Sequence, residues 1–411
     1  MSVEGLKCKE CGTKYEESAA YFCENCFGPL EVSYDHSGLD AAEVKRRIQA
    51  GSHGIWRYSD FLPISGNPGD PLEPGLTPLV RADRLAELLG TEAEVYVKND
   101  AANPTHSFKD RVVAVAVAKA KELGFDTIAC ASTGNLANAV AARAAAEGLE
   151  SYVLVPADLE EQKLLASDVY GTNLVGVRGN YDAVNRLCTE LVDTQPWAFV
   201  NVNLRPYYAE GSKTLAFETV EQLGWELPDR VVAPIGSGSL FTKLGRGFQE
   251  WIDLGLVEGD QPTFHGAQAD GCSPVATAFA EGHDVCKPQR PDTIAKSLAI
   301  GDPADGPYAI EHARQTGGNI SSVSDEEIRE GIKLLAEGTG IFTETAGGVT
   351  IAVLRRLAER GEFKAGEKVV AYITGEGLKT LDATRDTFSM HEIDPNLESF
   401  DSEFAAQEVS A

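Results

Sequence analysis

Short β-branched runs alternate with longer alanine-rich or amphipathic segments from residue 94 to residue 373. This alternation limits the fold more than any other feature, because strands separated by helices pair in parallel and are covered by those helices. We expect strands at 94–98, 127–131, 151–155, 173–177, 198–202, 230–235, 263–267 and 367–373. We expect helices at 107–123, 136–148, 158–169, 211–223, 239–254, 324–337 and 347–360. The sequence therefore predicts an α/β protein with parallel sheets.

The chain is strongly acidic, with a formal net charge of −27 over 411 residues. A nucleic-acid backbone would meet like charge on such a surface, so we expect no nucleic-acid partner. Two explanations of the acidity stay open. The carboxylates form either an ordinary solvated surface or an adaptation to high salt, where they stay hydrated and their repulsion is screened.

No segment of the sequence has the composition of a membrane or export signal. The opening residues, MSVEGLKCKECG, lack the apolar stretch of a signal peptide. No apolar run approaches the roughly 18 residues that a spanning helix needs. We therefore expect a cytoplasmic protein without a membrane partner.

Four of the eight cysteines form two CxxC pairs, Cys8 with Cys11 and Cys23 with Cys26. Each pair can place two thiolates on one turn, and two such turns complete a tetrahedral zinc site. We expect a structural zinc ion, because four thiolates leave no open position for water. Two disulfides are the alternative, and a cytoplasmic location disfavours them.

The segment NPTHSFKDR, residues 103–111, places a lysine at the start of an expected helix. Ser107 is a good N-cap and Asp110 follows three residues later, as in a capping box. Lys109 then lies in the first turn, where the helix dipole and burial favour the neutral amine that attacks a carbonyl. Taken alone, a solvated lysine is the commoner explanation.

Three further segments provide polar groups where strands end. ASTGN (131–135) and PIGSGSL (234–240) each join an expected strand to an expected helix, and both offer backbone N–H groups and hydroxyls to an anion. ITGEGLK (373–379) presents the Thr374 hydroxyl at the carboxyl edge of a sheet, where α/β proteins bind ligands. Plain turns are the alternative for each segment, but together they predict a site that holds an amine, two anions and a hydroxyl.

These segments resemble fold-type II pyridoxal-phosphate (PLP) enzymes, and threonine synthases in particular. The resemblance runs from about residue 75 to residue 385 and includes GLTPLV (75–80), NPTHSFKDR, ASTGN, YYAEGSKT (207–214), PIGSGSL, IFTETAGG (341–348) and TGEGLK. A four-cysteine segment that ends in Gly28-Pro29-Leu30-Glu31 is similar to archaeal threonine synthases. The order of SFKDR and STGN makes the resemblance more specific than any one loop.

The resemblance implies two three-layer α/β/α domains with parallel sheets, preceded by a zinc ribbon, and a homodimer. Residues 1–36 would form the zinc ribbon, and residues 37–95 with 206–391 a larger domain that carries the PLP phosphate loop. Residues 96–205 would form a smaller domain with the STGN loop, and 392–411 an acidic tail.

The resemblance also implies roles for individual residues. Lys109 would hold the cofactor and move protons, Asn135 would bond its 3′-oxygen, and Thr374 would face its pyridine nitrogen. A neutral hydroxyl there suits eliminations and replacements better than transamination. The cofactor phosphate would lie on Gly236, Ser237, Gly238 and Ser239, and the substrate carboxylate on Ser132, Thr133 and Gly134. The implied reaction converts a small amino-acid phosphate, O-phospho-L-homoserine, and water to L-threonine and phosphate.

Two positions depart from the family pattern. His106 replaces the usual glycine before SFKDR, and it is either an acid/base group or a packing or hydrogen-bonding residue. Tyr208, in NVNLRPYYAEG, replaces an arginine that helps to bind the substrate phosphate. Residues that could substitute for this arginine are Asn201, Asn203 and Arg205. A second open choice concerns Glu344, which either lines the PLP ring or caps a helix.

Because of the Tyr208 departure, other readings of the function stay open. A serine or threonine dehydratase, or a cysteate-synthase-like enzyme acting on O-phosphoserine, would keep PLP and change the substrate. A zinc-ribbon interaction protein on a scaffold without catalysis is a further alternative, which Lys109 and both anion loops disfavour.

Overall fold

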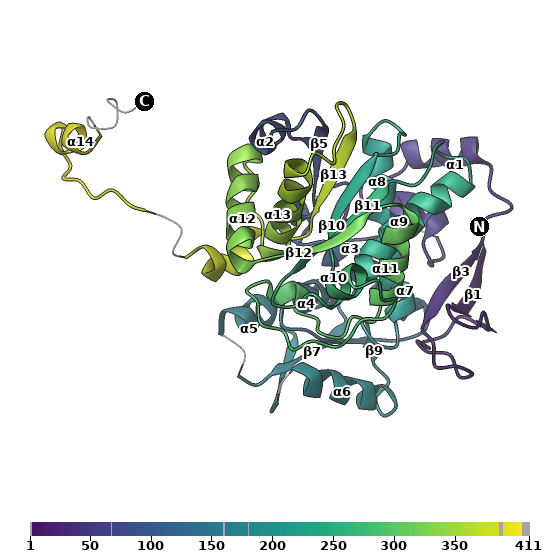
Figure 1. Ribbon diagram of the computed structural model, residues 1–411. Coiled ribbons are helices and arrows are strands. Elements are labelled where there is room, and N and C mark those ends of the chain that lie inside the picture. Colours follow the sequence, from purple (N-terminus) through teal and green to yellow (C-terminus); the bar gives the residue numbers. More distant parts are fainter. Residues whose placement is uncertain (1, 67, 159–160, 180, 386–388, 405–411) are drawn as a thin grey trace. The chain divides into compact units, whose positions relative to one another are not determined.

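The computed structural model describes residues 2–66, 68–158, 161–179, 181–385 and 389–404. The chain divides into two units, Met1–Lys379 and Thr380–Ala411. The first unit contains three sheets of six, four and three strands (Figure 1). None of the helices in the described part of the chain combines the length and apolarity of a membrane span.

The largest sheet has the strand order β12-β11-β10-β13-β5-β4. Its strands are β4 (Leu79–Arg81), β5 (Glu94–Asn99), β10 (Arg230–Pro234), β11 (Thr263–Ala269), β12 (Asn319–Val323) and β13 (Lys368–Ile373). All neighbours pair in parallel except β4, which runs antiparallel to β5. The register pairs Val232 of β10 with Ala371 of β13, so the two strands end at the same edge of the sheet.

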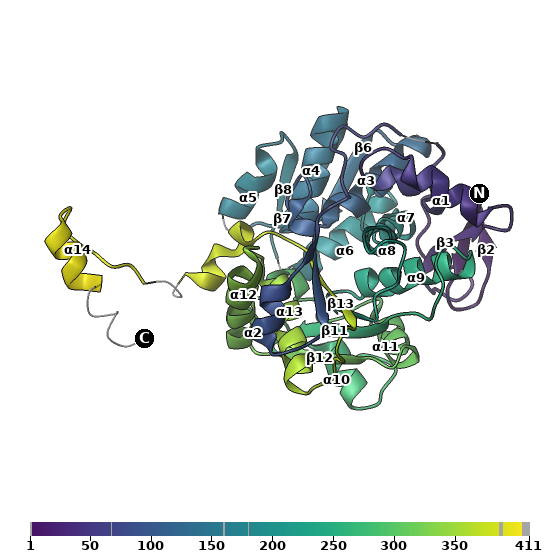
Figure 2. The same ribbon diagram turned by 90° about the horizontal axis from the view of Figure 1, so that it is seen from above.

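Helices cover both faces of this sheet because successive side chains of a strand point to opposite faces. Val231 and Val370 pack with α8 (Lys213–Gln222), α9 (Ser239–Asp253), α10 (Pro274–Ala280) and α11 (Gly306–Gln315). Val232 and Val369 pack with α2 (Asp83–Leu89), α12 (Asp325–Thr339) and α13 (Thr345–Glu359). Figure 2 shows α2, α12 and α13 together beside β13. The three layers are those of an α/β/α domain.

The four-stranded sheet has the order β8-β7-β6-β9, and its pairs are all parallel. Its strands are β6 (Thr127–Ala131), β7 (Glu150–Pro156), β8 (Asn173–Val177) and β9 (Ala198–Phe199). Ile128 and Val153 pack with α3 (Lys109–Glu122) and α4 (Asn135–Glu147), whereas Ala129 and Leu154 pack with α6 (Tyr181–Val192). This sheet is therefore also covered by helices on both faces.

The N-terminal module is a small antiparallel sheet with the order β2-β1-β3. Its strands are β1 (Ser2–Cys8), β2 (Lys14–Tyr15) and β3 (Leu30–Asp35). Leu6 and Val32 share a hydrophobic core with α3 and α4. The Tyr34 hydroxyl also donates to Glu210 at 2.7 Å, so the module is packed against the rest of its unit.

The remaining elements are short or connect the sheets. They are α1 (Ala41–Gln49), η1 (Ile55–Phe61), η2 (Asp100–Ala102), α5 (Glu161–Asp168), α7 (Arg205–Glu210), η3 (Lys296–Leu298), η4 (Gly377–Thr384) and α14 (Leu397–Phe404). Helix α14 forms inside the predicted acidic tail, of which residues 405–411 lie outside the described residues. Residues 159 and 160 of one predicted helix also lie outside them, and α5 starts directly after.

The predicted α/β class with parallel sheets is confirmed, and every predicted strand is present. One strand is shorter than expected, because β9 ends at Phe199 and the chain turns there. The Phe199 N–H donates to the Asn203 side chain at 2.8 Å, which closes this turn. The predicted division into larger and smaller domains remains a prediction.

Candidate active site

Helix α3 begins at Lys109, and its start is held by the end of strand β13. The Phe108 N–H donates to the Thr374 carbonyl at 2.9 Å, and Ser107 forms an antiparallel bridge with Gly375. The predicted capping box is wrong, because Phe108 occupies the N-cap and Asp110 accepts instead from the Thr105 N–H at 2.8 Å. The bridge thus leaves the Ser107 hydroxyl buried without a hydrogen-bond partner.

His106 stands where the backbone needs a left-handed conformation. Its φ is 62°, and the bridge to β13 continues through its carbonyl, which accepts from Glu376 N–H at 3.1 Å. Glycine adopts this conformation without strain, which accounts for the glycine that the family usually has there. The His106 side chain is exposed, which disfavours a packing role and leaves its acid/base and hydrogen-bonding alternatives open.

The Lys109 amine has a close polar neighbour. Its Nζ donates to the Tyr208 hydroxyl at 2.8 Å and lies 4.6 Å from the centre of the Phe108 ring. Tyr208 is 8% exposed and belongs to α7, which also contacts α3. Sequence reasoning named Tyr208 only as a replaced arginine and missed this contact. The signal in the sequence was the tyrosine itself, which stands where the family pattern has an arginine.

Asn135 is the first residue of α4 and lies in a chain of polar contacts that reaches Thr374. Its Nδ2 donates to the Glu344 carboxylate at 2.9 Å, and the Thr374 hydroxyl donates to the same carboxylate at 3.3 Å. Glu344 is 3% exposed, and burial raises the pKa of its carboxyl. Glu344 occupies the N-cap of α13, but its side chain forms no cap hydrogen bond. Its carboxylate accepts from Asn135 and Thr374 instead.

The segment Gly236–Ser239 lies between β10 and α9. Gly238 caps α9 with a φ of 95°, and a Cβ at this position would lie 2.7 Å from the Asp305 carbonyl oxygen. The Asp305 N–H donates to the Ser237 carbonyl at 2.8 Å. The Ser239 N–H donates to the Ser237 hydroxyl at 3.4 Å, and the N-cap Gly238 offers no side-chain cap to the next N–H groups of α9, which leaves those open to an anion. Because β10 and β13 end at one edge, this loop lies at the same edge as Thr374.

The loop Ser132–Gly134 directly precedes Asn135, which ties it to the same polar chain. The Ser132 hydroxyl accepts from the Gly134 N–H at 3.3 Å, and Gly134 is exposed. Asn201 lies beside this loop, since its Nδ2 donates to the Ala131 carbonyl at 3.5 Å. Its Oδ1 is buried and has no hydrogen-bond partner, so it is placed to accept from a ligand.

The other two substrate candidates have protein partners. Asn203 is 4% exposed, and its amide bonds the backbone of Phe199 and Trp197 at 2.8 and 3.1 Å, which gives it a role in the β9 turn. Arg205 donates to the Asp305 carboxylate at 2.8 Å and therefore lies on the phosphate-loop side.

The four cysteines of the N-terminal module converge. All four sulfur atoms lie within 4.8 Å of one another, with separations of 3.5 Å for Cys8–Cys26 and 3.6 Å for Cys11–Cys23. Zinc–sulfur bonds of about 2.3 Å at tetrahedral angles place sulfurs about 3.8 Å apart, which fits this cluster. All four are free thiols, so the disulfide alternative is not formed in this structure.

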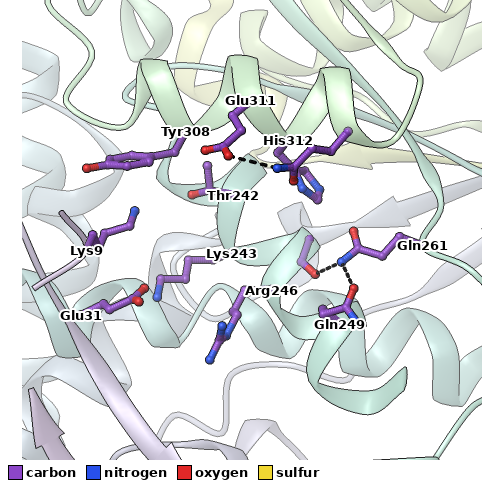
Figure 3. Close-up of a pocket in the computed structure, with 12 residues that line it drawn as sticks. Lys9, Glu31, Thr242, Lys243, Arg246, Gln249, Gln261, Tyr308, Glu311 and His312 are labelled. Carbon is purple, nitrogen blue, oxygen red and sulfur yellow. Dashed lines mark hydrogen bonds between the residues drawn. The ribbon is translucent and has the colours of Figure 1, made fainter. Parts of the chain in front are cut away.

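A cavity of about 320 Å³ is lined by residues of the cysteine module, α9 and α11 (Figure 3). Its lining includes Lys9 and Glu31 of the cysteine module, Lys243 of α9 and Tyr308 of α11, and Lys9 Nζ lies 3.5 Å from the centre of the Tyr308 ring. None of the predicted cofactor or substrate residues lines this cavity. It borders the candidate site only indirectly, because α9 begins in the Gly236–Ser239 loop and the N-cap residue of α11, Asp305, donates its N–H to the Ser237 carbonyl.

The gathered residues fit PLP by their chemistry. An amine at Lys109, a glycine–serine loop with open N–H groups at α9 and a hydroxyl at Thr374 lie at one sheet edge. A family model described as pyridoxal-phosphate dependent enzyme matches residues 71–375. The chain therefore belongs to the pyridoxal-phosphate dependent enzymes.

Within that family the chain is similar to threonine synthases. Threonine synthase of Methanocaldococcus jannaschii is 38% identical over 92% of this chain and 93% of that protein. Threonine synthase of Methanosarcina acetivorans is 38% identical over 91% of this chain and 92% of that protein. These relatives make it a member of the threonine synthase group.

Solved structures share the fold. The processed form of threonine deaminase isoform 2 from Solanum lycopersicum has a TM-score of 0.63 at 20% identity and covers 86% of this chain and 94% of its own. Maize serine racemase has a TM-score of 0.62 at 16% identity and covers 90% of this chain and 97% of its own. At these identities the likeness concerns the fold alone, and it agrees with the predicted fold-type II architecture.

Proposed function

We propose that this chain converts O-phospho-L-homoserine and water to L-threonine and phosphate, using PLP held on Lys109. The observation that carries the proposal is the 38% identity with threonine synthases over more than nine tenths of both chains. The geometry supports it, because the amine, the Gly236–Ser239 loop and the Thr374 hydroxyl lie at one edge of the larger sheet. The second anion loop, Ser132–Gly134, follows a strand of the smaller sheet and is linked to them through Asn135 and Glu344.

PLP, when bound, withdraws electrons from the substrate carbon next to its amino group. Lys109 then takes the proton from Cα and next a proton from Cβ of the substrate. The phosphate would leave from Cγ with the C–O bonding electrons, and the two protons taken up would return to Cγ, which becomes the methyl group, and to Cα. Water would supply the hydroxyl at Cβ, and its second proton would pass to the solvent or to the phosphate. The Tyr208 hydroxyl, 2.8 Å from Lys109 Nζ, keeps the amine in one position for these transfers. Such positioning is a main source of enzymatic rate enhancement.

The remaining residues bind the cofactor and the substrate ends. The cofactor phosphate is held by the open N–H groups and hydroxyls of Gly236–Ser239, and its 3′-oxygen by Asn135. The substrate carboxylate is received by the Ser132–Gly134 loop. Arg205, with a side chain that is 32% exposed, is the cationic candidate for the substrate phosphate. Asn201 could contribute only through its Nδ2, because its unpaired Oδ1 is an acceptor and would repel a phosphate.

We further propose that the four-cysteine cluster binds one structural zinc ion. Cysteine ligands alone fill the four positions, so the ion would stabilise the module and take no part in the chemistry. A homodimer, a cytoplasmic location and a salt-adapted acidic surface remain predictions from the sequence.

The proposal is tested by phosphate release from O-phospho-L-homoserine with purified, PLP-supplemented protein. We expect Lys109→Ala to lower the rate by about a thousandfold, in the range for loss of a positioned acid/base group. Lys121→Ala, on the same helix and exposed, serves as the matched control and should leave the rate unchanged. Equal rates for wild type and Lys109→Ala would remove Lys109 from its role.

The Tyr208 departure keeps a second substrate class in view, because an arginine for the leaving phosphate is absent at this position. Parallel assays with threonine and O-phosphoserine address it. Faster turnover of either compound than of O-phospho-L-homoserine would favour a dehydratase or a cysteate-synthase-like enzyme over the proposed activity.

A further inference from the structure

Lys379 is a second lysine at the candidate site, and the proposed reaction does not use it. It follows β13 in the segment η4 and is partly buried. Its Nζ donates to the Thr105 carbonyl at 2.5 Å and to the Asn135 Oδ1 at 2.9 Å. The ammonium group therefore contacts the residue assigned to the cofactor's 3′-oxygen.

The amide of Asn135 can point in two ways, because its oxygen and nitrogen ends have nearly the same shape. An ammonium group donates hydrogen bonds and cannot accept them. Lys379 therefore requires the oxygen of Asn135 on its own side. The nitrogen must then face away from Lys379, where Glu344 accepts one of its two N–H bonds at 2.9 Å and the other stays available.

We propose that Lys379 is a positioning residue that fixes the Asn135 amide so that it presents an N–H to the 3′-oxygen of PLP. The inference rests on the proposed function, since it assumes that PLP occupies this site. The 3′-oxygen of PLP carries negative charge and needs a donor. The reversed amide would present its own oxygen and repel it.

Glu344 alone does not fix the orientation as securely. Burial raises the pKa of the Glu344 carboxyl, and a protonated carboxyl can donate to an amide oxygen as well as accept from an amide nitrogen. The other acidic groups that act on Lys379 are Asp110 and Glu376, and neither is bonded to Asn135. Burial lowers the pKa of the Lys379 amine, whereas Glu344, Asp110 and Glu376 favour its charged form. In that ammonium form, Lys379 permits only one orientation of the Asn135 amide.

A purely structural role would look different. Lys379 also ties the Thr105 carbonyl, so its loss could loosen the loop before Lys109 without acting through Asn135. The two roles are separated by a double-mutant cycle, because only the positioning role disappears when residue 135 has no amide.

The test measures the PLP dissociation constant by absorbance titration of the full chain after removal of cofactor. We expect Lys379→Met to raise the constant about tenfold, which is the loss of one charge-assisted hydrogen bond. Lys379→Arg keeps a donor-only cation and should stay within about threefold of wild type. Lys364→Met, at an exposed lysine, is the control and should leave the constant unchanged.

The decisive comparison uses Asn135→Ala as background. There Lys379→Met should change the dissociation constant by less than about twofold. A tenfold loss in both backgrounds would overturn the positioning role, and so would an unchanged constant for Lys379→Met in wild type. If wild type binds no PLP at all, the proposed function fails together with this inference. Should Lys379→Met not fold by circular dichroism, Lys379→Gln takes its place in the cycle with the same expectations.

Discussion

Four charged side chains are buried together behind the start of α3. They are Lys98, Asp100, Arg111 and Glu218, and each side chain is at most 1% exposed. The Glu218 carboxylate accepts from Lys98 Nζ at 2.7 Å, from Arg111 at 2.7 Å and from the Leu76 N–H at 2.8 Å. Two positive and two negative charges balance, and Arg111 lies two residues after Lys109. The cluster therefore anchors the helix that begins at Lys109.

We predict that Glu218→Gln lowers the free energy of unfolding by about 3–5 kcal/mol, the usual cost of removing one partner from a buried ion pair. The substitution leaves an excess positive charge among side chains without water. The glutamine amide also places a donor against a donor in both of its orientations, because each carboxylate oxygen of Glu218 accepts from Arg111. Whichever way the new amide points, its NH₂ group faces a guanidinium donor.

The size of this effect depends on pH in a defined direction. Burial raises the pKa of Glu218, but the Arg111 and Lys98 cations outweigh burial and lower it to about 2. The folded pKa thus lies below the ordinary value of 4.5, so the stabilisation is complete above 4.5 and is lost as pH falls toward 2. The difference between wild type and Glu218→Gln should be constant from about pH 8 to about pH 6 and shrink below about pH 4.5.

Urea unfolding followed by tryptophan fluorescence measures the difference, with both proteins in the same salt. Glu87→Gln removes a carboxylate from an exposed ion pair with Arg84 and should cause no measurable change. If the free energy of unfolding of Glu218→Gln lies within about 1 kcal/mol of the wild-type value at pH 7, the reasoning is refuted, because a buried unpaired charge should destabilise the protein by more than that.

Three further predictions concern other parts of the molecule. The purified chain should contain about one zinc ion, and Cys11→Ser should lose it; metal analysis near zero in wild type, with paired thiols, would rule the site out. Tyr208→Phe should lower kcat about tenfold at unchanged PLP affinity, because it frees the Lys109 amine; an unaltered kcat would show that the contact is idle. If the acidic surface is a salt adaptation, the unfolding temperature should rise steeply from low to molar salt, whereas a flat profile identifies an ordinary solvated surface.

The fold could be predicted from the sequence where strands are buried on both faces. Strands such as β6 and β13 are continuous apolar runs, and such runs are specific to covered parallel sheets. Strand β12, with the sequence NISSV, was missed because it lies at an edge of its sheet and carries polar residues. Short helices such as α7 were missed because they are formed by tertiary packing more than by periodicity.

The loops of the candidate site could be predicted from the sequence, but the contacts between their side chains could not. The order of the family motifs indicated Lys109 and Asn135 as candidates, and the structure joins Asn135 and the start of α3 to Thr374 through backbone and side-chain hydrogen bonds. The prediction that Ser107 caps α3 was wrong, because Ser107 forms a tertiary bridge with Gly375 in place of the local cap. The partners Tyr208 and Lys379 are 99 and 244 residues away from the residues they contact, and no local pattern encodes such pairs.

The position of β13 has a consequence for how the chain is made. This strand lies between β10 and β5, yet it is the last of the sheet to leave the ribosome. Until residue 373 is synthesised, β5 and β10 each expose an unpaired apolar edge, a state prone to pairing with other chains. Nascent chains stopped before β13 should therefore aggregate or recruit chaperones, and the sheet should close slowly because its central pairs are distant in sequence. The candidate site can form only after β13 has been synthesised, because the end of this strand holds the start of α3 and is followed directly by Thr374.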